Sequence, residues 1–107
     1  MVEYIGIRRQ NGCEVYRAEY RGSGIIRRSP LPTRSDLQDY APGFDWGHDC
    51  DEALQLALAI LSDHTRDDAR ALQFHQSYKN LVVLELSVDF WRLSAKDVES
   101  TLCSLQS

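Results

Sequence analysis

Residues 50–63 read Cys50-Asp-Glu-Ala-Leu-Gln-Leu-Ala-Leu-Ala-Ile-Leu-Ser-Asp63 and contain the longest uninterrupted apolar run of the chain, Leu56 to Leu61. On a helix this segment is apolar on nearly every side, and only a narrow stripe is small or polar: Glu52, Gln55, Ala59 and Ser62. A helix with this pattern lies at the centre of its domain. Asp49 and Glu52 have the spacing of a capping box, so we expect Asp49 to be the N-cap of a helix over 50–63.

Two further helices are predicted downstream. Thr65 and Asp68 also have capping-box spacing, and they precede apolar residues that recur on one helical face: Ala71, Phe74, Tyr78, Leu81 and Val82. Residues 81–86 suit a strand as well, but the same face continues through Val82, so we predict a helix over 65–86. Ser94 and Asp97 form a third capping box, which predicts a short amphipathic helix with its apolar face inward: Val98, Leu102 and Leu105.

The N-terminal part of the chain has the pattern of strands. Residues 2–7 and 14–20 flank Asn11-Gly12, the preferred pair for a type I′ turn, and apolar and polar residues alternate along 16–20. A second turn signal, Arg21-Gly-Ser-Gly24, precedes a short run at 25–28. The sequence therefore predicts an α+β fold in which an N-terminal three-stranded antiparallel sheet packs with three C-terminal helices.

Size and composition indicate one domain over 1–107, divided into a β-meander (1–28), a loop with several prolines and glycines (29–48) and a helical half (49–107). Hydrophobic content of 43% and charged content of 26% are typical of globular proteins. We predict neither a membrane span nor a signal peptide, and an odd set of three cysteines favours thiols in the reducing cytoplasm. The net charge of −4 divides into +4 over residues 1–34 and −8 over the remainder.

Seven short motifs occur along the chain in this order: Tyr4-Ile5-Gly6, Leu31-Pro32, Phe44-Asp45-Trp46-Gly47, Ala53 to Leu61, Phe74 with Tyr78-Lys79, Trp91 to Ser94, and Asp97-Val98. Together they resemble a family of small uncharacterised domains from bacteria, phages and mobile elements, grouped as a domain of unknown function. The Phe-acid-Trp-Gly motif before the Ala/Leu-rich helix is the most specific part. This chain departs from the family after Gly47, where His48 to Glu52 replaces a Tyr and a Gly-rich turn. The resemblance implies the fold and a phage or mobile-element setting, and no activity.

One cluster, His48-Asp49-Cys50-Asp51, has the residue types of a metal or catalytic site. Neighbours on an extended loop point to opposite sides, and the usual zinc-ligand spacings are absent, so we predict no metal and no cofactor. The acids around Cys50 oppose formation of a thiolate, which disfavours a Cys50–His48 nucleophile pair. We therefore predict that the protein is not an enzyme. A small cytosolic enzyme with a site near His48 and Cys50 stays an alternative.

Acidic residues crowd a stretch of seventeen residues that contains no Lys or Arg: Asp36, Asp39, Asp45, Asp49, Asp51 and Glu52. This pattern favours a partner with a basic surface, such as a host complex that handles nucleic acid or acts in defence. Trp46 in the same stretch is a candidate anchor, although its place before a buried helix favours the core. A solvated loop that also supplies helix caps explains the same acids equally well. Our hypothesis is a non-enzymatic protein-binding domain from a phage or mobile element.

Arginines suggest a different class of function. If the first and third strands share an edge of the sheet, four arginines lie side by side there: Arg8, Arg9, Arg27 and Arg28. Such an edge, with tyrosines nearby, suits the backbone and bases of a nucleic acid. The alternative hypothesis is therefore a small nucleic-acid-binding protein, which the acidic net charge disfavours.

Overall fold

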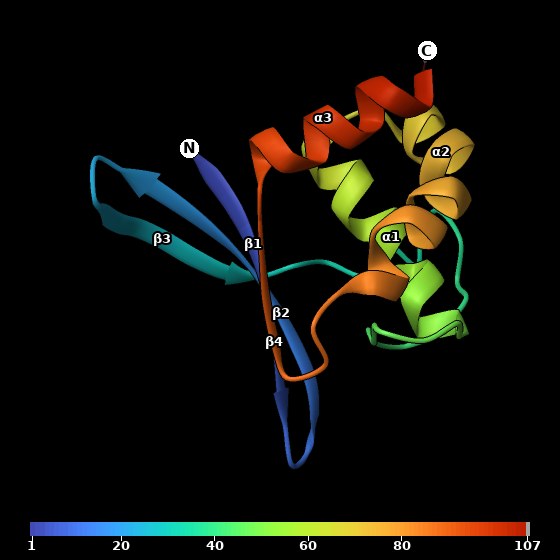
Figure 1. The fold of residues 1–107 in the computed structure, drawn as a ribbon, viewed down its shortest axis with the longest axis horizontal. Coiled ribbons are helices and arrows are strands. Elements are labelled where there is room, and N and C mark those ends of the chain that lie inside the picture. The colour runs from blue at the N-terminus through green and yellow to red at the C-terminus, as the bar shows by residue number, and fades with distance from the viewer. Residues whose placement is uncertain (107) are drawn as a thin grey trace.

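Antiparallel strands and helices occupy separate layers in the computed structural model, which describes residues 1–106 (Figure 1). The sheet contains β1 (Val2–Arg9), β2 (Gly12–Arg21), β3 (Gly24–Pro30) and β4 (Phe90–Ser94) in the order β3-β2-β1-β4. Three helices pack beside it: α1 (Asp51–Thr65), α2 (Asp68–Leu81) and α3 (Ala95–Gln106). The predicted α+β class and the three helices are confirmed. The sheet has four strands, so the prediction of three is wrong.

The fourth strand comes from the half of the chain that was predicted to be helical. β4 runs antiparallel to β1 over Glu3–Ile7, and this pairing places Trp91 opposite Gly6. The Trp91 indole is 4% exposed and lies against Gly6, where any Cβ atom would overlap its ring. A glycine at this point of β1 therefore makes the space that the last strand needs.

The turn between β1 and β2 differs from the predicted type I′ turn. Arg9 pairs with Gly12, so Gln10 and Asn11 are the two residues of the loop. Gly12 has a φ of 131°, and Asn11 is not among the residues with positive φ. Glycine adopts such an angle without steric cost, which explains its place after the loop. The second turn is as expected, because Arg21 pairs with Gly24 across Gly22 and Ser23.

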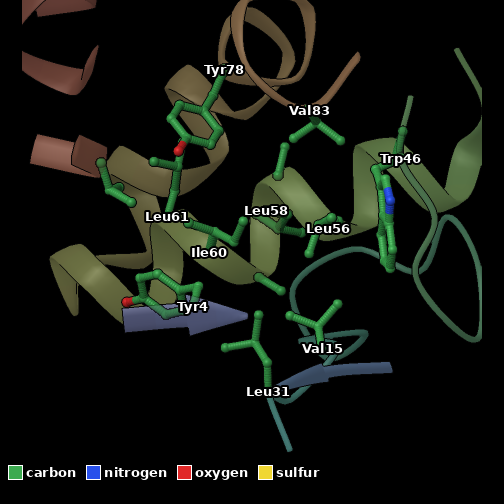
Figure 2. Packing of buried hydrophobic residues seen from close by; sticks show 14 of the residues in the cluster. Tyr4, Val15, Leu31, Trp46, Leu56, Leu58, Ile60, Leu61, Tyr78 and Val83 are labelled. Carbon is green, nitrogen blue, oxygen red and sulfur yellow. The ribbon is translucent and has the colours of Figure 1, made fainter. Parts of the chain in front are cut away.

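Helix α1 is the centre of the core, as the sequence predicted. Its residues from Leu56 to Leu61 are fully buried. Figure 2 shows the larger of them, Leu56, Leu58, Ile60 and Leu61, between the sheet, α2 and the segment after α2. The predicted capping box at its start is wrong. The N-cap is Cys50, which caps with no side-chain hydrogen bond. The Asp49 carboxylate accepts a hydrogen bond from Lys79 Nζ at 2.8 Å, so it is directed to α2 instead.

Helix α2 is shorter than the predicted helix over 65–86. Thr65 ends α1, and Asp67 is the N-cap of α2, where its carboxylate accepts a hydrogen bond from the Arg70 amide. The helix stops at Leu81, and a 3-10 turn, η1 (Val83–Glu85), follows it. The third capping box is confirmed, because Ser94 and Asp97 exchange side-chain-to-amide hydrogen bonds of 3.1 Å. Within residues 1–106, no helix has the length and apolar character to cross a membrane.

Candidate functional site

The segment between β3 and α1, residues 31–50, is called the acidic loop from here on, and Gln55 of α1 holds its first half. The Gln55 amide nitrogen donates to the carbonyl oxygens of Thr33 and Gln38, at 2.6 and 3.1 Å. Its amide oxygen accepts from the backbone nitrogens of Tyr40 and Ala41, at 2.7 and 3.2 Å. The buried side chain thus uses all four of its hydrogen-bonding positions, so it fixes the path of the loop across α1.

Trp46 anchors the second half of the acidic loop in the core. The side chain is 0% exposed, and its indole nitrogen donates to the Val88 carbonyl at 2.9 Å. Its ring meets Trp91 edge to face with centroids 5.5 Å apart. Core packing is the role that the sequence favoured for Trp46. A side chain buried in this way offers no surface to a partner.

Asp45 lies between Arg8 of β1 and the start of α1. Its Oδ1 accepts from Arg8 Nη2 at 2.5 Å and from the Trp46 amide at 2.7 Å. Arg8 also lies over the Trp46 ring and donates through Nε to the Val88 carbonyl. Burial raises the pKa of Asp45, but the hydrogen bonds from Arg8 and the Trp46 amide outweigh it and bring the pKa below its ordinary value. Asp45 is therefore a fixed carboxylate and not a free surface charge.

His48 and Cys50 point toward Asp45. One possible ligand atom from each of these three residues lies within 4.8 Å of the other two. His48 Nε2 is 3.8 Å from Asp45 Oδ2, and the sulfur of Cys13, on β2, is 3.6 Å from Asp45 Oδ1. Asp49, between the other two, is directed to Lys79. Neighbouring side chains of the loop do point to opposite sides, as expected. Because His48 and Cys50 are two residues apart, they lie on the same side, together with Asp45.

Both thiols of this cluster are poor nucleophiles as they stand. Burial raises the pKa of the Cys13 thiol, and the Asp45 carboxylate adds to the effect. Burial also raises the pKa of Cys50, and the Glu52 carboxylate adds to it, although backbone amides at the start of α1 act in the opposite direction. Neutral thiols bind metals or form covalent bonds only after they lose the proton.

The remaining acids of the predicted partner site fall into two groups. Asp36 pairs with Arg34, and Asp49 pairs with Lys79. Asp39 and Asp51 are exposed, Glu52 is half-buried, and these three have no ion pair among residues 1–106. Asp39 lies between two residues that Gln55 holds, and Asp51 lies one turn before Gln55 on α1. The unpaired acids thus belong to one anchored region.

The four arginines do not form the edge that the nucleic-acid hypothesis required. β2 lies between β1 and β3, so the condition that the first and third strands share an edge is not met. Arg8 pairs with Cys13 beside the first turn, whereas Arg28 pairs with Ala18 toward the other end of β2. Arg9 forms an ion pair with Glu14, and Arg28 lies over the Tyr16 ring at 4.0 Å. The four arginines therefore do not form one row: Arg8 pairs with Asp45, whereas Arg9 and Arg28 contact Glu14 and Tyr16, which are hydrogen-bonded to each other.

A cleft of about 290 Å³ opens elsewhere, beside the C-terminal end of α1. Its lining is Pro32, Arg34, Ala59, Ser62, Asp63, Arg66 and Asp68. Asp63 accepts hydrogen bonds from the Tyr4 hydroxyl and from Arg17 Nε, and Arg34 pairs with Asp68. Within the lining, Arg34 and Asp68 pair with each other, and the partners of Asp63 lie outside it. Neither His48 nor Cys50 lines it, so the cleft does not provide the predicted enzyme site.

Sequence reasoning missed two residues of the site. Gln55 was assigned to a polar stripe on α1, but a lone glutamine inside an otherwise apolar helix signals a buried amide that needs partners. Cys13 lies far from the loop in sequence, and only the pairing of β1 with β2 brings it near Asp45. No local pattern connects it with His48 and Cys50.

These features define a small α+β domain with an anchored acidic loop and a half-buried cluster of thiol, imidazole and carboxylate groups. Residues 4–104 match the model of a family of unknown function, DUF6166, and the chain belongs to that family. No curated protein matches the chain. No solved structure matches it either. The resemblance to a domain of unknown function is thus confirmed, and the match assigns no activity.

Proposed function

We propose that the chain is a non-enzymatic protein-binding domain of the cytoplasm that uses its acidic loop and the start of α1 to engage a basic surface. The observation that carries the proposal is the group of acids without ion pairs, Asp39, Asp51 and Glu52, on a region that Gln55 anchors. Carboxylates of this kind attract a partner of opposite charge and set the orientation in which it docks.

The anchoring of the loop supports binding as well. A loop that is already ordered loses little conformational freedom when a partner docks, so more of the contact energy appears as affinity. Gln55 orders residues 33–41, and Trp46 orders the residues before α1. The acidic loop therefore meets its partner in one conformation.

The partner that fits this surface is a protein whose basic face holds nucleic acid. Lysines and arginines of such a face are spaced to meet phosphates, and a rigid set of carboxylates competes for the same groups. The proposal therefore places the partner in a host complex that handles nucleic acid. In its specific form, the proposal is that the protein originates from a phage or mobile element and inhibits this host complex, in the manner of an anti-CRISPR protein.

Affinity purification from cells that carry the protein tests the proposal, with captured proteins identified by mass spectrometry. The test variant is Asp39→Lys with Asp51→Lys. The control, Glu85→Lys with Glu99→Lys, changes the net charge equally at exposed acids outside the acidic loop and α1. We expect the test variant to capture at least about tenfold less partner, because like charges then face each other. The control should capture as much partner as the wild type. The captured partner should also be released by added DNA.

Capture that is unchanged in the test variant would contradict the acidic-loop proposal. A gel shift with Arg27→Ala and Arg28→Ala checks the nucleic-acid alternative in the same preparation. A complex with nucleic acid that weakens in this variant and with rising salt would replace protein binding by the arginine-based function.

A further inference from the structure

Asp45, His48 and Cys50 bring three kinds of metal ligand together on one side of the acidic loop. One ligand atom from each lies within 4.8 Å of the other two. Around a tetrahedral zinc ion, bonds of about 2.0–2.3 Å leave neighbouring ligand atoms about 3.3–3.8 Å apart. His48 Nε2 and Asp45 Oδ2 are 3.8 Å apart, and the Cys13 sulfur is 3.6 Å from Asp45 Oδ1. Cys13 lies on the Oδ1 side of the carboxylate, outside this group of three, so its thiol has to rotate to reach an ion held by Oδ2. We propose that Asp45, His48 and Cys50, completed by Cys13 in this way, bind one divalent ion of the zinc class.

The backbone supports this arrangement. Cys50 has extended angles, φ −157° and ψ 167°, and it stands two residues after His48, so both side chains leave the loop on the same side. Asp45 precedes them in the same loop, and Cys13 reaches the cluster from β2. The His48 side chain is 60% exposed, so its ring can rotate toward an ion held by Oδ2 of Asp45.

Arg8 and the Trp46 amide hold Asp45 as an oriented ligand. Both donate to Oδ1, which leaves Oδ2 directed to His48. Partners of this kind behind a ligating carboxylate fix its orientation in metal sites. Charge also balances, because two thiolates and one carboxylate offset a divalent ion together with the Arg8 guanidinium. On binding, the ion replaces the two thiol protons, which pass to solvent.

The ion would join three parts of the fold. Cys13 belongs to β2, Cys50 caps α1, and Asp45 and His48 belong to the acidic loop between them. The Cys50 thiol makes no hydrogen bond to the first turn of α1 and donates instead to the His48 carbonyl at 3.6 Å, a contact that a bound metal would replace. A bound ion therefore stabilises the entry into the central helix.

Cobalt titration of the full chain tests the site. The protein is prepared without a polyhistidine tag, reduced, treated with a chelator and titrated with Co²⁺ and then with Zn²⁺. We expect one equivalent of Co²⁺ to bind with thiolate-to-cobalt absorption, and Zn²⁺ to displace it. Cys13→Ser and Cys50→Ser should each lose part of that absorption. His48→Ala should bind at least about tenfold more weakly, the lower end of the loss caused by removing even an outer-shell partner.

Cys103→Ser and His64→Ala are the matched controls. Cys103 lies on α3, and His64 lies at the C-terminal end of α1, where it pairs with Glu99 of α3. Both controls should bind Co²⁺ like the wild type. Absence of the thiolate absorption in the wild type, or wild-type binding by Cys50→Ser and His48→Ala, would overturn the site. His48 is exposed, so its variant folds even if a cysteine variant does not, and circular dichroism checks this. The charge-reversal variants used for partner capture leave all four ligands intact, so the two proposals fail separately.

Discussion

At Gln55, one side chain determines where nine residues of backbone lie. Its amide bonds to the backbone at Thr33, Gln38, Tyr40 and Ala41, groups that have no partner in a helix or strand at this place. Buried amides and carbonyls cost free energy when they are left unpaired. A single glutamine therefore provides the backbone hydrogen bonds that secondary structure would otherwise supply. The acids beside it are held in place by the same bonds.

Replacing this glutamine by leucine is expected to destabilise the protein. Gln55→Leu keeps most of the volume but leaves up to four backbone groups without partners, at about 1–3 kcal/mol for each buried one, so we expect a loss of about 3 kcal/mol in the free energy of unfolding. Urea denaturation measures it. Gln76→Leu on the exposed side of α2 is the control, with a change of less than about 0.5 kcal/mol. Equal effects of the two changes would contradict the anchoring role.

Among the elements, the contact between β1 and β4 depends most on one residue type. Gly6 and Trp91 face each other across the two strands, and a Cβ atom at Gly6 would overlap the indole. Trp91 cannot move away freely, because its other side meets Trp46. The strand pair and the aromatic core therefore share one constraint.

Gly6→Ala should lower the free energy of unfolding by about 3 kcal/mol, the upper part of the usual cost of overpacking a core. The control is Gly43→Ala, because a Cβ at Gly43 meets nothing within 4 Å and its φ is not positive. It should leave stability unchanged or raise it by up to about 1 kcal/mol. Thermal unfolding followed by circular dichroism compares the two. A Gly6 variant as stable as the control would mean that Trp91 repacks without cost.

The elements also show what sequence could predict. Helices α1 and α3 were predictable because a long apolar pattern and a reciprocal capping box are local signals. β4 was not, because five residues become a strand only through pairing with β1 at the other end of the chain. The end of α2 was misjudged because residues 81–86 suit either structure. In the site, the acids of the loop were found, but the pairing of Asp45 with Arg8 and of Asp49 with Lys79 depends on tertiary contacts.

Over the whole molecule, ion pairs link acidity to stability. The pKa values of five carboxylates lie below their ordinary values, chiefly through hydrogen bonds from arginine, tyrosine or histidine side chains: Glu14, Glu19, Asp36, Asp45 and Glu99. For Asp45, burial acts in the opposite direction and is outweighed. A carboxylate with a lowered pKa binds its proton less readily in the folded state than in the unfolded state. The folded protein thus gains stability above the unfolded pKa.

We expect the free energy of unfolding to be constant from neutral pH down to about pH 5, and to fall as the pH drops through the ordinary carboxylate range near 4 and then through the lowered values. Urea denaturation at a series of pH values measures this. High salt should flatten the slope, since most of these pairs are exposed and screened. A stability that does not change between pH 5 and pH 2 would show that the pairs do not persist in solution.

The placement of β4 beside β1 has a consequence for how the protein is made. On the ribosome, β1, β2 and β3 emerge first, and β1 then presents an open edge and the vacant space above Gly6. That edge closes only after residues 90–94 have been synthesised, about sixty residues after the end of β3. Synthesis proceeds at about 5–20 residues per second. The nascent chain therefore spends seconds with its sheet incomplete, and any chain released before Trp91 lacks the strand that finishes it.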